Sequence, residues 1–161
     1  MPILSRQEAV TELLDGAISA WFDGRHACAI TLAGAAEGAM PRTRELPSAF
    51  EMLRHMVALT CECTEEQAGT MLNANRNWLK HSDGIKPNEI DTEYAWVMIL
   101  RAYAQYLVTY EDAEQTAEMR RFQEWFKDQF APVRDLLQRF FAVIQAFGKA
   151  VTETWPRPPT A

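Results

Sequence analysis

The side chains best suited to chemistry in this chain lie in one short polar segment. On a helix, Asn73, Asn77 and His81 fall one turn apart on a single face, and Arg76 and Lys80 form a second pair beside it. Imidazole moves a proton near neutral pH, guanidinium holds two phosphate oxygens, and amides fix orientation. These residue types are those of a phosphodiester site, so the segment predicts binding or cleavage of RNA or of a nucleotide phosphate.

The charge balance limits how such a ligand could be bound. Residues 1–80 carry 7 basic and 10 acidic side chains and residues 81–161 carry 9 and 12, so each half is −3 and the chain is −6. Binding along a nucleic-acid duplex relies on many phosphate contacts from Lys and Arg, which this balance disfavours. Residues 76–86 nevertheless hold three cations and a histidine against one aspartate. The sequence therefore predicts one small basic site in an acidic protein.

Helix geometry sets a condition on this site. Arg76 and His81 are five residues apart, so a continuous helix points them about 140° from each other. They converge only if the helix ends near Lys80, which Asp83 and Gly84 permit, or if a second subunit completes the site. The alternative is structural, because a Lys-His pair in the last turn of a helix is a favourable partner for the helix dipole.

The rest of the sequence predicts helices to position these residues. Apolar residues recur with helical spacing, no segment shows the alternation of a strand, and three pairs have capping-box spacing: Ser5 with Glu8, Ser48 with Glu51, and Thr64 with Gln67. The expected helices cover about 5–24, 26–40, 48–61, 64–81 and 89–110. The last third of the chain is expected to form one or two more helices, and Pro132 can open the second of them. We expect an all-α, single-domain bundle of six or seven helices over residues 1–152, with a flexible Pro-rich tail at 153–161.

Several features indicate how this bundle packs. The helix at 89–110 is the most apolar and is expected at its centre, and the Ala- and Gly-rich helix at 26–40 allows close approach of a neighbour. Cys28, among those alanines, is expected to be buried. The aromatic stripe of Phe122, Trp125, Phe126 and Phe130 is expected in the core, with a dimer face as the alternative.

The polar segment also resembles a known signature. Arg76, four intervening residues and His81, with the polar Asn77 after the arginine, resemble the R-x(4–6)-H motif of HEPN domains, which are helical bundles of bacterial toxins, defence proteins and some nucleases. The helical hairpin at 14–40, with Glu37 inside it, also resembles that superfamily. More closely, residues 10–130 resemble an uncharacterised group of small bacterial helical proteins with an N-x-x-K-H motif, from which no function can be transferred.

The HEPN resemblance implies a mechanism and an assembly. In HEPN ribonucleases the arginine and histidine of two subunits meet across a dimer interface and cleave RNA without a metal. Here it implies that His81 is the general acid or base, that Arg76 holds the phosphate, and that Asn77 supports the site. Many HEPN domains are inactive binding modules, so the second hypothesis is a non-catalytic module for protein interaction or dimerisation.

Other classes of site are not indicated. Cys61 and Cys63 with His55 lack the second ligand pair of a structural zinc site, no phosphate-cradling glycine loop is present, and no cofactor is expected. Three cysteines without a disulfide framework, no export signal and no apolar run of membrane-spanning length predict a reduced, cytoplasmic protein that does not contact a membrane. The resemblance to small bacterial proteins implies a bacterial origin. A small-molecule carrier with a pocket lined by tryptophans stays open as a third interpretation.

Overall fold

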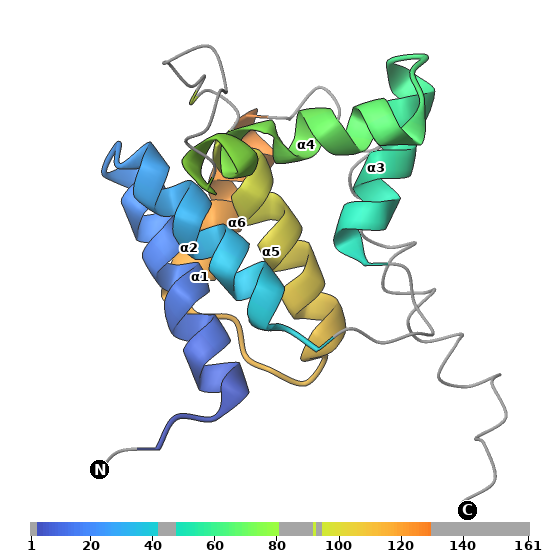
Figure 1. The fold of residues 1–161 in the computed structure, drawn as a ribbon. Coiled ribbons are helices and arrows are strands. Elements are labelled where there is room, and N and C mark those ends of the chain that lie inside the picture. Colours follow the sequence, from blue (N-terminus) through green and yellow to red (C-terminus); the bar gives the residue numbers. More distant parts are fainter. Residues whose placement is uncertain (1–2, 42–47, 81–91, 93–94, 130–161) are drawn as a thin grey trace, which may run out of the picture.

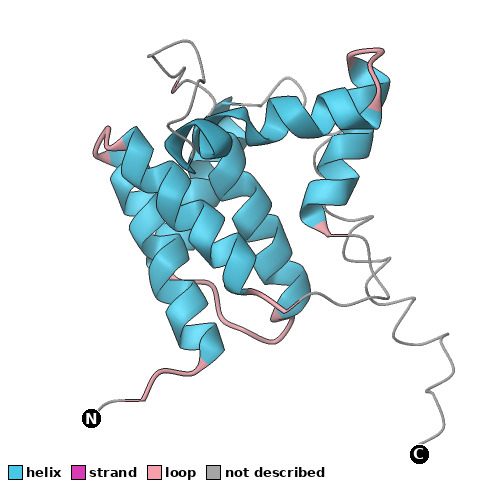
Figure 2. Cartoon of the chain, in the orientation of Figure 1, coloured by secondary structure: helices cyan, strands magenta, loops and turns pink. Residues whose placement is uncertain are grey.

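The computed structural model describes residues 3–41, 48–80, 92 and 95–129. In this part of the chain the secondary structure is six α-helices without a strand, as Figures 1 and 2 show: α1 (Arg6–Phe22), α2 (His26–Ala39), α3 (Ala49–Thr60), α4 (Glu65–Lys80), α5 (Ala95–Thr109) and α6 (Ala117–Gln129). The predicted all-α fold class is confirmed. The helix expected from Pro132 and the tail at 153–161 lie outside the described residues.

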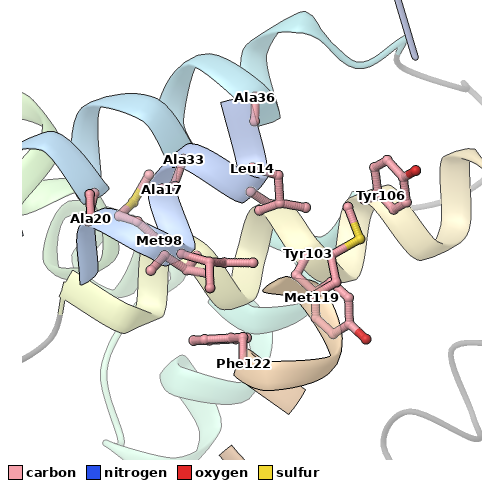
Figure 3. Close-up of a cluster of buried hydrophobic side chains, with 14 of the residues drawn as sticks. Leu14, Ala17, Ala20, Ala33, Ala36, Met98, Tyr103, Tyr106, Met119 and Phe122 are labelled. Carbon is pink, nitrogen blue, oxygen red and sulfur yellow. The ribbon is translucent and has the colours of Figure 1, made fainter. Parts of the chain in front are cut away.

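Helices α1, α2, α5 and α6 form the bundle that holds the core (Figure 1). Small side chains of α1 and α2 allow these two helices to pack closely, and larger side chains from α5 and α6 fill the space beside them (Figure 3). The labelled core residues are Leu14, Ala17 and Ala20 of α1, Ala33 and Ala36 of α2, Met98, Tyr103 and Tyr106 of α5, and Met119 and Phe122 of α6. Eight residues of α5 are buried, which confirms its central position.

The predicted capping boxes are present. The Ser5 hydroxyl accepts from the Glu8 amide at 3.2 Å, and the Glu8 carboxylate accepts from the Ser5 amide at 2.7 Å. Ser48 makes the same pair of contacts with its glutamate three residues later. At the start of α4, the Thr64 amide donates to the Gln67 side chain at 2.9 Å. Each box satisfies two amides that the first helical turn leaves unpaired.

Helices α3 and α4 form an arm that extends away from the bundle (Figure 1). The arm buries few residues: Ala49 and Ala58 of α3, and Ala68 of α4. Two large apolar side chains of the arm are exposed to solvent, Leu59 at 68% and Met71 at 58%. None of the described helices has the length and apolarity of a membrane span.

Two expectations about burial have different outcomes. Phe122 and Phe126 are buried, so the aromatic stripe belongs to the core, while Phe130 lies outside the described residues. The prediction for Cys28 is wrong, because its side chain is exposed. Helix α2 turns Ala29 and Ile30 inward, and an alanine-rich sequence does not by itself show which face is buried.

Candidate functional site

A charged cluster joins α2, α4 and α5 at the base of the arm. Its centre is Arg101 of α5, which is 3% exposed. Arg101 Nη2 donates to Glu37 Oε2 at 2.7 Å and to Oε1 at 2.9 Å, and Nε donates to Oε1 at 3.1 Å. Bidentate contacts of this kind are the strong form of an Arg–carboxylate pair.

The Nη1 group and one planar face of the Arg101 guanidinium contact residues of the arm. Nη1 donates to the Leu72 carbonyl and to Asn73 Oδ1, both at 3.0 Å. The guanidinium carbon lies 4.4 Å from the centre of the Phe50 ring, within the range of a cation–π contact. Burial lowers the pKa of Arg101, and the Glu37 carboxylate opposes that effect. The guanidinium stays charged because an arginine side chain does not lose its proton in proteins.

A second arginine, Arg76 of α4, lies on the glycine-rich surface of α2. A Cβ atom built at Gly34 would stand 3.2 Å from Arg76 Nε, and one at Gly38 would stand 3.9 Å from Nη2. Arg76 Nε is buried without a hydrogen-bond partner, although the side chain as a whole is 28% exposed. Gly34 therefore provides the space in which the Arg76 side chain lies against the helix, whereas a side chain at Gly38 would be in ordinary contact with it.

Among the residues that the structure describes, the cluster contains more positive than negative charge. Arg76 Nη1 is 3.8 Å from Glu37 Oε2, within the range of an ion pair but too long for a hydrogen bond. The same carboxylate already accepts three shorter hydrogen bonds from Arg101. One carboxylate thus faces two guanidinium groups, and the partly exposed Arg76 carries the charge that Glu37 does not neutralise.

The structure divides the residues predicted for the site. Asn73 accepts a hydrogen bond from the buried Arg101, whereas Asn77 is exposed. Lys80 is exposed in the last residue of α4, one turn beyond Arg76. His81 lies outside the described residues, so its predicted convergence with Arg76 stays a prediction.

Sequence reasoning did not identify Arg101 as part of the cluster, nor its ion pair with Glu37. A signal for Arg101 was present, because it is the one charged residue between 95 and 108, in the most apolar helix of the chain. Arginine is almost never fully buried unless it is paired, so this position indicated a buried ion pair. Its partner is 64 residues away in sequence, and no local pattern connects the two.

The other candidate group, around the turn between α3 and α4, forms ordinary surface contacts. His55 Nδ1 lies 3.1 Å from Glu65 Oε1, and Arg54 Nη2 lies 2.9 Å from Glu65 Oε2. The hydrogen bond with His55, followed by the charge of Arg54, lowers the pKa of Glu65. Cys61 is exposed and Cys63 is partly so. Within the described ranges, His, Cys, Asp and Glu side chains form no group of three that could hold a metal.

The chain was compared with known protein families, proteins and structures. No protein-family model, curated protein or solved structure matches the chain.

Proposed function

We propose that this chain binds the phosphate group of RNA or of a nucleotide through Arg76, Asn77 and Lys80 at the C-terminal end of α4. The observation that carries the proposal is the charge of Arg76. Within the described ranges its carboxylate partner is Glu37, which is occupied by Arg101 at 2.7–3.1 Å, while Arg76 keeps a longer contact and is partly exposed. An incoming phosphate supplies the negative charge that this arginine lacks.

The neighbouring side chains support the same ligand. Lys80 lies one helical turn beyond Arg76 on the same side of α4 and is exposed. Asn77 is also exposed and provides both a donor and an acceptor. Asn73 was predicted for the same group. It accepts a hydrogen bond from the buried Arg101 and so helps to hold α4 in place behind the exposed side chains.

The HEPN resemblance extends the proposal to catalysis. In this form, a cytoplasmic bacterial homodimer cleaves RNA without a metal, with Arg76 on the phosphate and His81 moving the proton of the ribose 2′-hydroxyl. An imidazole suits that role because its ordinary pKa is near 6.5. The resemblance and the positive charge at Arg76 support this extension.

Binding is tested by fluorescence anisotropy with a labelled single-stranded RNA oligonucleotide and by competition with AMP. The Arg76→Ala variant is expected to bind the RNA about tenfold more weakly. The slope of the logarithm of the binding constant against the logarithm of the salt concentration is expected to fall by about one. Arg120→Ala on α6 removes the same charge from an exposed position and is the matched control. Competition by AMP indicates a nucleotide site, and RNA binding that AMP leaves unchanged indicates a polynucleotide site. Equal affinities of wild type and Arg76→Ala would end the proposal.

Catalysis is tested separately, by RNA cleavage in the presence of EDTA. Wild type is expected to cleave the RNA and His81→Ala to be inactive, with RNA binding retained in both. Equal cleavage by the two proteins, or none by either, removes the catalytic extension and leaves the binding proposal standing.

A second candidate function is a non-catalytic module for protein interaction, with a second copy of this chain as the partner. The observation in its favour is the exposure of Leu59 and Met71 on the arm. Light scattering after size-exclusion chromatography is expected to give a dimer for wild type and a monomer for the Leu59→Ser/Met71→Ser variant. A monomeric wild type contradicts this candidate.

A further inference from the structure

We infer that Gly34 of α2 is a positioning residue for the phosphate site, because it fixes where the guanidinium of Arg76 lies. This inference rests on the proposed function. The site residues suggested by the sequence are all on α4 or directly after it. Gly34 is on a different helix, 42 residues earlier in the chain.

The argument begins with the space beside Gly34. A methyl group at this position would stand 3.2 Å from Arg76 Nε and 3.5 Å from its Cδ, and the first distance is shorter than ordinary van der Waals contact. The third neighbour, the Met98 methyl, would be 3.6 Å away, which is ordinary contact. A side chain at position 34 therefore meets Arg76 first, and the arginine side chain has to shift by a few tenths of an ångström to admit it.

The same contact decides which edge of the arginine is available to a ligand. A guanidinium can hold phosphate oxygens through Nε and one terminal nitrogen, or through both terminal nitrogens. Arg76 Nε is buried beside Gly34 and has no hydrogen-bond partner. The geometry leaves the two terminal nitrogens, Nη1 and Nη2, for the phosphate.

Holding the side chain in this position strengthens binding. A free arginine loses rotamer entropy when it grips a ligand, whereas one that already lies in its bound position loses less. Gly34 allows that position, and the ion pair with Glu37 at 3.8 Å favours it. Replacing Gly34 by alanine is expected to move the guanidinium away and to weaken phosphate binding.

Gly38 provides a matched control on the same helix. It lies one turn after Gly34, and a methyl group there would stand 3.9 Å from Arg76 Nη2, which is ordinary contact. Alanine raises helix propensity at both positions. Gly38→Ala is therefore expected to raise the melting temperature and leave RNA binding within twofold of wild type.

The test is a double-mutant cycle on RNA affinity, with the same labelled oligonucleotide as above. Gly34→Ala is expected to weaken binding about three- to tenfold in the wild-type background and to have no further effect in Arg76→Ala. A role of Gly34 in overall stability alone would change both backgrounds alike. An unchanged affinity in Gly34→Ala, or effects that add, would overturn the inference.

A thermal readout keeps the test valid if Gly34→Ala folds poorly. Because the closest atoms to the new methyl group belong to Arg76, the Gly34→Ala/Arg76→Ala protein is expected to recover the melting temperature of Arg76→Ala. A double variant that stays less stable contradicts the inference. If Arg76→Ala binds RNA as tightly as wild type does, the proposed function itself is wrong. If Arg76→Ala binds weakly but Gly34→Ala leaves the affinity unchanged or the two effects add, only the inference about Gly34 is wrong.

Discussion

The bundle of α1, α2, α5 and α6 and the arm of α3 and α4 are held in place by different contacts. In the bundle, α1 buries five residues and α5 buries eight, nearly all apolar. In the arm, the buried residues of α3 and α4 are three alanines. Polar contacts join the arm to the bundle: Arg101 with the Leu72 carbonyl and Asn73, and the Ala49 amide with Gln105 at 3.0 Å. Leu79 of α4 adds an apolar contact with the core.

This difference shows why the candidate site depends on a buried ion pair. Apolar packing tolerates small adjustments, but a buried charge that loses its partner carries a large desolvation cost. Arg101 holds the helix that bears Arg76 and Lys80 through its hydrogen bond to Asn73. The buried charge of Arg101 is in turn compensated by the carboxylate of Glu37. A change in this pair is expected to affect the arm first and the bundle less.

The largest effect is expected from Arg101→Met, which leaves the mostly buried Glu37 carboxylate with only its 3.8 Å contact to Arg76. Removing one member of a buried pair costs about 3–5 kcal/mol of unfolding free energy, measured by urea denaturation. Hydrogen exchange is expected to become faster in α4 than in α1 and α2. Arg120→Met, at an exposed position on α6, is the control and is expected within about 0.5 kcal/mol of wild type. A loss below about 1 kcal/mol for Arg101→Met would contradict the comparison.

A smaller effect is expected when apolar side chains of the two regions are shortened. Leu14 in the bundle is fully buried, and Leu14→Ala is expected to lower the unfolding free energy by about 2–5 kcal/mol because a cavity remains. Met71 on the arm is 58% exposed, and Met71→Ala is expected to change it by less than about 0.5 kcal/mol. Similar losses in the two variants would show that the arm is packed as tightly as the bundle.

The smallest effect concerns a polar contact inside the bundle. Thr116 Oγ1 donates to Asp15 Oδ1 at 2.6 Å, which joins α1 to the start of α6. Burial raises the pKa of Asp15 above its ordinary value of 3.8, although the Thr116 hydrogen bond opposes the shift. The folded state therefore holds this proton more tightly than the unfolded state does. The resulting stability is present below the ordinary pKa and is lost as the pH rises through the folded value.

Asp15→Asn removes this titration while an oxygen stays available to Thr116. The melting temperature of the variant relative to wild type is therefore expected to rise between about pH 3.5 and pH 7. Calorimetry at several pH values measures that difference. A difference that stays constant across the range would show that burial of Asp15 has no effect on stability.

The helices themselves could be predicted because their signals are local. Ser5 with Glu8 and Ser48 with Glu51 are three residues apart, and a capping box forms whenever the following residues are helical. The burial of Phe122 followed from helical spacing on α6. The candidate site was predicted in part: Arg76 and Lys80 were identified by type, but the role of Asn73 was not, because its partner is on α5.

By itself, the sequence determined the all-α class and the starts of α1 to α4, since these depend on neighbours within one or two turns, whereas α5 begins at Ala95 and not near residue 89 as expected. It also indicated a basic segment at the end of α4. The tertiary structure alone decided that Glu37 pairs with Arg101, that Asn73 turns toward that pair, and that Arg76 lies against Gly34. The paired residues are far apart in the sequence: 28 positions for Asn73 and Arg101, 42 for Gly34 and Arg76, and 64 for Glu37 and Arg101. The contacts therefore exist only once α2, α4 and α5 have packed together.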